Sequence, residues 1–452
     1  MLSHSHSSKT KSSFQASKSP EITGPSETLS HSCDSYITRL SQLTHRTPVR
    51  KQYHGGTHRI MEPEETWKRV QPILSRTGIT RVANVTGLDH IGIPVFMVCR
   101  PNARSVSVSQ GKGLSVSCAR VSGVMEALEL FHAENIHRPL HYSSYNEMSR
   151  RKRTTNVERI CKTRHSPFNK DTPILWIEGV DLLSNEPTWV PYECVSMNTS
   201  LPHPPGSGCF LATSNGLASG NDIVEAVNHG LYEVIERDAT TLWHFSDDAN
   251  LSNRLLDLDT VDDVACKEGL ERCRQAGVFV LAWDLTSDVG IPTFACLIGE
   301  DEYGLAYQRS AASGYGCHLD RGIALLRAIT EAVQSRLTYI AGSRDDLFRD
   351  EYKDNVQTRI HLRQCEVLRG IKGSRKFHEI AVAATETVDS DLQLLIRRLQ
   401  DVGVDEIVAV DLSDPELEVP VARVVVPGLE GPHSDPDYVP GPRGRAAQEV
   451  SV

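Results

Sequence analysis

The chain has 452 residues, of which 39% are hydrophobic and 23% are charged, and its formal net charge is −10 at pH 7. This length accommodates two or three domains, and the apolar content is sufficient for a sizeable core. The acidic balance argues against a general nucleic-acid-binding protein, because neutralising phosphates requires an excess of Lys and Arg.

The eleven cysteines are scattered along the chain and match neither a zinc-binding nor a thioredoxin-type spacing. Scattered thiols with apolar neighbours are typical of a protein in a reducing compartment, so we expect a cytoplasmic location. No stretch approaches the roughly 20 apolar residues that a membrane span requires.

The first 50 residues are rich in Ser, His, Lys and Thr and lack periodic apolar residues, which predicts a disordered tail over 1–50. We expect one main domain over 51–430 and a Pro- and Gly-rich tail over 431–452. Strands, Gly-containing turns and acidic helices recur in this order, which predicts an α/β (α+β) fold with mixed sheets.

The main domain is expected to begin with a short helix over Pro63–Leu74 and strands over Arg81–Val85 and Ile93–Val98. Arg104–Ser109 then alternates as a strand and leads into a turn at Gln110–Gly113, with the letters QGKG. The turn superficially resembles a phosphate loop but lacks the Walker A pattern.

Ser117–Asn135 is predicted to form a helix with a partly acidic stripe, and the stripe contains Ser122, Glu126, Glu129 and Ala133. The basic run Ser149–Arg153 that follows is interpreted as a solvated insertion. Strands are expected over Ile174–Ile177 and Thr188–Val190.

The most informative stretch is Thr213–Trp243, which opens with turn-forming residues and continues as a helix capped by Asn221 or Asp222. One helix face is apolar, and the opposite face carries Glu225, His229, Glu233 and Glu236. A solvated face usually interleaves Glu with Lys four residues apart, and this face does not. Uncompensated carboxylates indicate a cation, and Mg²⁺ is typically shared between carboxylates and the oxygens of a bound nucleotide.

Beyond this helix we expect a helix over Thr260–Ala276, strands over Val278–Asp284 and Ile291–Ile298, a helix over Asp389–Asp401, and strands over Glu406–Asp411 and Ala422–Val426. A further helix, Asp320–Tyr339, is predicted to carry Asp320, Arg327, Glu331 and Gln334 on one face. Taken alone, its Arg and Glu could form a surface ion pair.

Three helices with acidic stripes are explained most economically if the stripes converge on one site. The carboxylates of Glu126, Glu129, Glu225, Glu233, Glu236 and Glu331 would then hold Mg²⁺. Arg237 and Arg327 would contact phosphate oxygens and stabilise the charge that develops in phosphoryl transfer.

Several motifs occur in an order that strongly resembles the YcaO family: SQGKG with EALE, TSNGLASGN with EVIERD, and LLRAITEAVQSR. The resemblance covers about residues 55–430. It implies a YcaO-type fold and an ATP-dependent enzyme that phosphorylates a peptide-backbone amide oxygen, giving an azoline or, with a sulfide source, a thioamide.

The resemblance also implies roles for individual residues, with Arg237, Arg327 and Glu331 as catalytic residues. The implied ATP and Mg²⁺ site consists of Glu126, Glu129, Asn221, Glu225, Glu233, Glu236, Arg237, Arg327 and Glu331. Arg59 and Thr66 match a motif in which the family favours Lys and Ser. Lys112 lies in a family motif and is assigned to neither substrate nor phosphate.

The segments SVSQGKG, THRIMEPEET and ARVVVPGLEG most resemble the family branch that works beside a TfuA-like protein in thioamidation. The alternatives are an azoline-forming cyclodehydratase for ribosomally made peptides and a non-catalytic accessory factor for ribosomal-protein methylthiolation. The expected partners are a peptide or protein substrate, a TfuA-like protein, a separate leader-binding protein and a second copy of the chain in a homodimer. No nucleic acid or membrane is expected.

Overall fold

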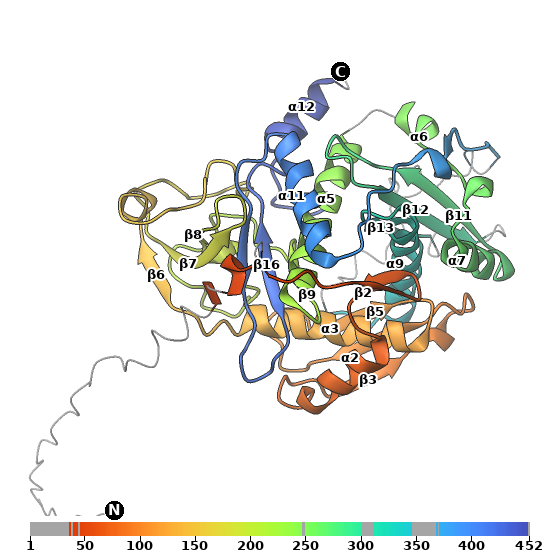
Figure 1. Ribbon diagram of the computed structural model, residues 1–452, viewed down its shortest axis with the longest axis horizontal. Coiled ribbons are helices and arrows are strands. Elements are labelled where there is room, and N and C mark those ends of the chain that lie inside the picture. The colour runs from red at the N-terminus through yellow and green to blue at the C-terminus, as the bar shows by residue number, and fades with distance from the viewer. Residues whose placement is uncertain are drawn as a thin grey trace, which may run out of the picture.

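The structure is a computed structural model and describes residues 36, 37, 39–43, 46–245, 249–300, 311–345, 368 and 370–450. Helices and strands alternate along the chain, so the expected mixed fold class is confirmed (Figure 1). The helices are α2 (Pro63–Val70), α3 (Val116–Glu134), α4 (Tyr145–Met148), α5 (Ile223–His244), α6 (Ala249–Asn253), α7 (Val264–Gln275), α9 (Arg321–Ala341), α11 (Val388–Asp401) and α12 (Pro442–Val450). The strands are β1 (Gln52–His54), β2 (Thr57–Arg59), β3 (Arg81–Asn84), β4 (Val95–Cys99), β5 (Val108–Lys112), β6 (Leu140–Ser143), β7 (Ile174–Asp181), β8 (Glu186–Pro191), β9 (Leu217–Ser219), β10 (Leu256–Asp257), β11 (Val278–Asp284), β12 (Thr293–Glu300), β13 (Ala312–Cys317), β14 (Arg375–Lys376), β15 (Val408–Asp411) and β16 (Val421–Val425).

The largest sheet has the strand order β6-β7-β15-β16-β9, with β8 also paired to β7. Successive residues of a strand point to opposite faces. Val408 and Val410 therefore pack with the apolar residues of α3, whereas Ala409 between them packs with those of α5 and α11. Both α3 and α5 contact β9 at the sheet edge, which brings their polar faces toward the same space.

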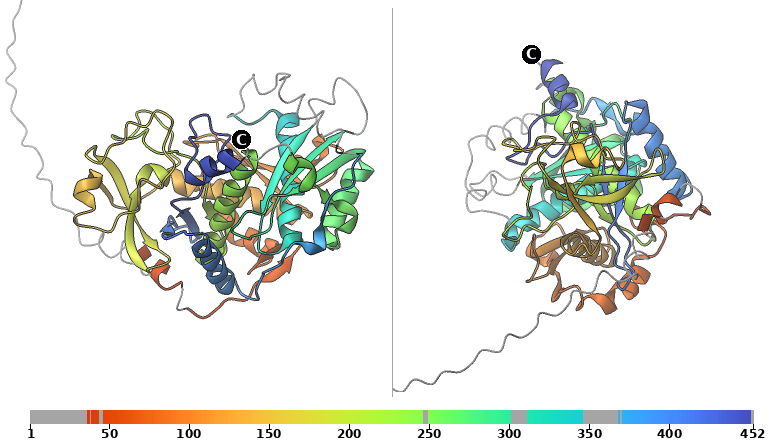
Figure 2. Two further views of the ribbon diagram at one scale, coloured as in Figure 1. Left: turned by 90° about the horizontal axis from the view of Figure 1, so that it is seen from above. Right: turned by 90° about the vertical axis from the view of Figure 1, so that its left-hand side faces the viewer.

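A second sheet, β11-β12-β13, is covered by α7 and α9, and Figure 2 shows it on the opposite side of α5 from the β6–β8 end of the largest sheet. Helix α9 lies directly on β13, because Gly314 and Gly316 of that strand carry no side chain. A Cβ atom at Gly314 would lie 2.2 Å from the Ala332 amide nitrogen. The third sheet, β3-β4-β5, holds α3 in the same way, and a Cβ atom at Gly111 would lie 2.0 Å from the Gly123 amide nitrogen.

The predicted strand Arg104–Ser109 with a turn at Gln110–Gly113 is wrong. Strand β5 instead runs from Val108 to Lys112, so the first three residues of the supposed turn are paired with β4. Two glycines near a lysine suggest a turn locally, but Gly111 is needed here for close contact with α3. The position of the strand therefore depends on tertiary packing.

The helix expected over Thr260–Ala276 begins only at Val264. The Asp263 side chain caps it by accepting a hydrogen bond from the Cys266 amide, and residues 258–260 form a separate 3₁₀ turn. The helix expected over Pro63–Leu74 likewise ends at Val70 and continues as one 3₁₀ turn through Pro72, which cannot donate a backbone hydrogen bond.

The two predicted tails are only partly described. Residues 1–35 and 451–452 lie outside the described residues. Leu40 and Leu43, within the first predicted tail, are buried in the core around α5 and α11. Most of the second predicted tail packs beside α5 and ends in α12. No helix in the described ranges is both long enough and apolar enough to cross a membrane.

We expect Gly111→Ala to lower the free energy of unfolding by about 1–3 kcal/mol, the usual cost of overpacking a tight contact. Urea denaturation measures this loss. Gly87→Ala is the matched control, since a Cβ atom there meets nothing within 4 Å. Equal stability of the two variants would show that α3 does not depend on the glycine contact.

Candidate active site

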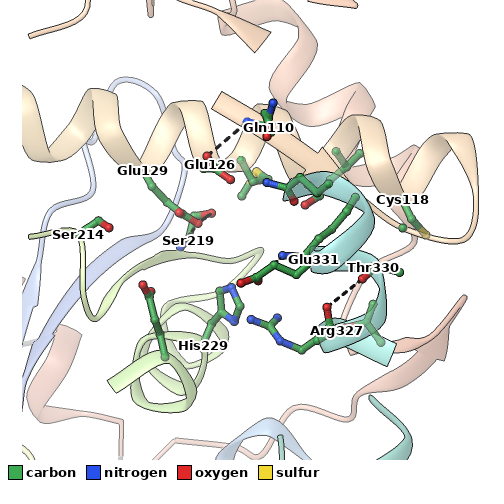
Figure 3. Close-up of a pocket in the computed structure, with 18 of the residues that line it drawn as sticks. Gln110, Cys118, Glu126, Glu129, Ser214, Ser219, His229, Arg327, Thr330 and Glu331 are labelled. Carbon is green, nitrogen blue, oxygen red and sulfur yellow. Dashed lines mark hydrogen bonds and ion pairs between the residues drawn. The ribbon is translucent and has the colours of Figure 1, made fainter. Parts of the chain in front are cut away.

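A cavity of about 920 Å³ lies between α3, α5 and α9, and we call it the acidic cavity. The hairpin β1–β2 and strand β5 contribute further lining residues. Figure 3 shows Glu126 and Glu129 projecting from α3 toward the space that also receives His229, Arg327 and Glu331. The three acidic stripes therefore converge, as the sequence predicts.

Helix α5 forms one wall of the acidic cavity. Asp222 caps this helix, because its side chain accepts a hydrogen bond from the Val224 amide. The cavity face carries Glu225, His229, Glu233, Glu236 and Arg237, whereas the opposite face carries Val224, Val227, Leu231, Val234 and Ile235. The predicted division of α5 into a polar and an apolar face is confirmed.

Helices α3 and α9 present carboxylates to the cavity through a common arrangement. The Gln110 amide on β5 donates to Glu126 Oε1 at 3.3 Å, and the Tyr315 amide on β13 donates to Glu331 Oε1 at 3.4 Å. Glu129 Oε1 accepts from the amide and the hydroxyl of Ser219, at 2.8 and 2.7 Å. Each carboxylate thus has a backbone donor that fixes its position.

Burial raises the pKa of several cavity carboxyl groups, because the low-polarity surroundings disfavour their charged form. The pKa of Glu129 is raised to about 8 and that of Glu233 to about 7. The pKa values of Glu126 and Glu236 are also raised by burial. Negative charge at these four positions is therefore not fully compensated by the protein itself.

Glu331 behaves differently from the other carboxyl groups. Burial disfavours its charge, but Lys112 and Arg237 outweigh this effect and hold its pKa below the ordinary value. Lys112 Nζ lies 2.6 Å from Glu331 Oε2. This contact shows that Lys112 enters the cavity from β5, although the sequence does not assign it a role.

The cavity also contains cationic groups. Arg237 Nη1 lies 3.6 Å from Glu236 Oε1, and the neighbouring carboxylates keep the pKa of Arg237 above its ordinary value despite burial. Glu236 Oε2 and Arg327 Nε are buried without a hydrogen-bond partner. One unpartnered acceptor and one unpartnered donor in the same cavity fit a ligand that brings both a cation and anionic oxygens.

The donor set fits a magnesium–nucleotide complex better than a metal ion held by protein alone. Across the described ranges, no three His, Cys, Asp or Glu side chains stand close enough to hold a metal ion by themselves. Mg²⁺ commonly takes one or two carboxylates and completes its shell with water and phosphate oxygens. The oxygen-rich cavity, with arginines on α5 and α9, supplies that kind of incomplete site.

All predicted site residues line the acidic cavity, including the less closely matched Arg59 and Thr66. The set comprises Arg59, Thr66, Glu126, Glu129, Asn221, Glu225, Glu233, Glu236, Arg237, Arg327 and Glu331. Thr66 Oγ1 donates to Asn221 Oδ1 at 3.0 Å, and Glu225 accepts from the Asn221 amide at 2.7 Å. These contacts join α2 to the start of α5.

Two residues assigned to the helical stripes do not line the cavity. Asp320 caps α9, where its carboxylate accepts from the Gly322 and Ile323 amides, and Ala133 is buried in the core below α3. Ser219 and the hairpin tip at Gly55–Thr57 also line the cavity, although no pattern in the sequence predicts this. Ser219 lies within the TSNGLASGN motif, but its contact with α3 spans 90 positions and leaves no local signal.

Comparisons with known proteins agree with this geometry. Residues 110–430 match the YcaO cyclodehydratase family, which is described as ATP- and Mg²⁺-binding. A protein encoded in the tfuA 3′ region of Rhizobium leguminosarum bv. trifolii is 36% identical over 386 residues, covering 84% of this chain and 89% of that protein. An uncharacterised protein of Methanothermobacter thermautotrophicus is 34% identical over 385 residues, covering 84% and 97%.

Solved structures of other proteins share the fold. A heterocyclase in complex with substrate and cofactor has a TM-score of 0.69 at 21% identity. That match covers 86% of this chain but only 56% of the heterocyclase. The YcaO protein of Methanopyrus kandleri, bound with AMPPCP and Mg²⁺, has a TM-score of 0.66 at 23% identity, with 85% and 95% covered.

The ligand-free protein should lose stability as the pH rises from about 6 to about 9. The pKa values of Glu129 and Glu233 are raised in the folded state, to about 8 and about 7, so the folded state binds more protons than the unfolded state over this range. The stabilisation is present at low pH and disappears as the pH passes through these values. Thermal melts at both ends of the range measure it.

Glu129→Gln provides the comparison for this experiment, since the amide keeps an oxygen for Ser219 but cannot ionise. Its melting temperature should fall less with pH than that of the unaltered protein. The same fall in both proteins would show that the Glu129 carboxyl group does not titrate in this range.

Proposed function

The chain belongs to the YcaO family, and we propose that it uses ATP and Mg²⁺ to phosphorylate a peptide-backbone amide oxygen, which is then replaced by sulfur. The convergence of three acidic helices on one cavity supports the first part of this proposal. The ATP-binding description of the family supports it independently. We propose a peptide or protein as the substrate.

The acidic cavity has residues for each part of a nucleotide. Mg²⁺ would be held by carboxylates drawn from Glu126, Glu129, Glu225, Glu233, Glu236 and Glu331, and it would neutralise charge on the phosphates. Arg237 and Arg327 would contact phosphate oxygens and stabilise the charge of the transition state. Arg59, Thr66 and Asn221, at the α2 end of the cavity, would contact the rest of the nucleotide.

An amide resists substitution at its carbonyl carbon because the amide oxygen is a poor leaving group. Phosphorylation of the amide oxygen, with loss of the amide proton, turns a poor leaving group into phosphate. Hydrosulfide can then form a C–S bond while the C–O bond breaks and its electron pair leaves with the phosphate. The S–H proton ends on the amide nitrogen, and the proton released in the first step accompanies the phosphate.

The observation that favours a thioamide over an azoline is the 36% identity to a protein encoded beside tfuA. The similarity covers most of both chains. It supports a TfuA-like protein as the partner that supplies or delivers sulfur. A leader-binding protein, a homodimer and a cytoplasmic location remain predictions.

We expect Glu233→Gln and Arg327→Ala to lower ATP turnover by about 100-fold or more, the usual effect of removing one group that stabilises transition-state charge. Both side chains line the cavity rather than the apolar core, so thermal melts should show a retained fold. Phosphate release with the cognate peptide measures turnover. Arg76→Ala, which removes an exposed ion pair with Glu416, serves as the control.

The nature of the product can be determined by mass spectrometry with ATP, Mg²⁺, sulfide, a TfuA-like partner and the cognate peptide. We expect one backbone oxygen to be replaced by sulfur. Loss of one water at a Cys, Ser or Thr would instead identify an azoline and retain amide activation. An unmodified peptide without ATP consumption would support the non-catalytic accessory role.

A further inference from the structure

A second, smaller cavity of about 70 Å³ lies beside the acidic cavity. The two cavities share one wall. Val234 lines the small cavity, and the preceding residue on α5, Glu233, lines the acidic cavity. In the same way Thr213 and Asn215 line the small cavity, and Ser214 between them lines the acidic cavity. One helical turn and one short loop therefore separate the two spaces.

The small cavity is lined by Arg423, a buried arginine on β16 whose side chain is only partly hydrogen-bonded. Its Nη2 atom donates to the carbonyl oxygen of Thr213. Its Nε and Nη1 atoms are buried without any hydrogen-bond partner. An unpartnered buried donor is costly, and more so when it is charged, so these two atoms favour a ligand that brings an acceptor.

Arg423 remains cationic at neutral pH. Burial lowers its pKa to about 10, and the charge of Glu233 across the shared wall opposes this effect. Within the described part of the chain Arg423 forms no ion pair, whereas Arg159, the other arginine of this cavity, pairs with Asp405 at 2.5 Å. The small cavity therefore contains a positive charge that no contacting carboxylate neutralises.

None of the remaining polar groups of the cavity accepts a hydrogen bond from Arg423 Nε or Nη1, although Asn215 Oδ1 also lines the cavity and is itself buried without a hydrogen-bond partner. The oxygens of Glu430 are occupied by Tyr438 Oη and by the amides of Gly441 and Gly444. Burial raises the pKa of Cys161 and Cys194, so both thiols are neutral. Cys161 Sγ already donates to the Leu429 carbonyl oxygen at 3.8 Å, which leaves the Cys194 thiol as a weak donor. The two unpartnered guanidinium donors and the Cys194 thiol favour an anion over a cation.

The volume limits the size of that anion. The cavity of about 70 Å³ is much smaller than the acidic cavity of about 920 Å³, which favours a small ion over a nucleotide or a peptide. We propose that the Arg423 cavity binds a small anion with one heavy atom, and specifically hydrosulfide, the nucleophile of the reaction. This inference rests on the proposed thioamide formation. It adds a place where the sulfur source is held, next to the cavity in which the amide is activated.

Anion binding can be tested directly by soaking crystals of the protein in bromide, which resembles hydrosulfide in charge and size and is located by its anomalous signal. We expect a bromide ion within hydrogen-bond distance of Arg423 Nε or Nη1. Water alone at this position would overturn the proposal. This measurement does not depend on any catalytic activity of the protein.

The role of the bound anion can be tested by the dependence of thioamide formation on sulfide concentration. We expect Arg423→Met to raise the KM for sulfide by about 10-fold or more, the loss of one charged hydrogen bond. The KM for the peptide should not change. Cys161→Leu, which fills the cavity without removing the arginine, should also raise the KM for sulfide, and bromide should compete with sulfide in the unaltered protein.

Arg138→Met is the matched control. Arg138 is also buried, but it donates to the carbonyl oxygens of Asp411 and Glu178, and it lines neither cavity. Its replacement should leave the KM for sulfide unchanged. An unchanged KM in both Arg423→Met and Cys161→Leu would overturn the sulfide role even if bromide binds, and the site would then hold a resident halide.

If thioamide formation itself is wrong, the results will differ from those expected when only the sulfide site is wrong. The unaltered protein would then make no thioamide at any sulfide concentration, although phosphate release with the peptide could still report amide activation. The sulfide role would fall with it, and bromide binding alone would decide whether the Arg423 cavity is an anion site.

Discussion

The structure depends on holding several carboxyl groups together in a buried cavity. Isolated charges are costly to bury, and like charges raise that cost further. The protein offsets part of it with fixed donors, such as the Ser219 amide at Glu129 and the Lys112 ammonium at Glu331. The raised pKa values of Glu129 and Glu233 show that the compensation is incomplete. A bound cation would complete it, so the free protein is prepared electrostatically for a ligand that carries one.

This arrangement requires helices that lie unusually close to strands. In β5 and β13 a glycine faces the helix, so that α3 and α9 approach the strand backbone directly. In both pairs a strand amide donates to a glutamate of the helix 16 residues later in the chain, from Gln110 to Glu126 and from Tyr315 to Glu331. A contact of this kind therefore positions Glu126 on α3, and an equivalent contact positions Glu331 on α9. The order of strand, glycine and acidic helix recurs in the sequence because each such unit forms this packing contact and this hydrogen bond.

The sequence allowed prediction of features that local patterns determine. The two faces of α5 and the extents of α5, α9 and α11 follow from apolar periodicity and capping residues. Family motifs and unpaired acidic stripes identify eleven candidate site residues in the sequence. All eleven line the acidic cavity. The error at Gln110–Gly113 arose because a glycine needed for tertiary contact looks like a turn residue. Asp320 shares the helical phase of Arg327 and Glu331 but caps α9, because helical phase alone does not distinguish a capping aspartate from one that faces the cavity.

Arg423 shows a further limit of sequence reasoning and explains how the two cavities are related. On β16 it reads as one polar residue within an apolar strand, and nothing nearby in the sequence indicates that its neighbours are Thr213 and Glu233. Glu233 lies between the cavities and acts on both: it is part of the proposed cation site, and its negative charge weakens the hold of Arg423 on any anion. A cation bound beside Glu233 would neutralise that charge and so favour an anion at Arg423, and by linkage an anion at Arg423 would favour the cation. Under the proposal, the shared wall would therefore couple the charge state of the acidic cavity to the binding of an anion at Arg423.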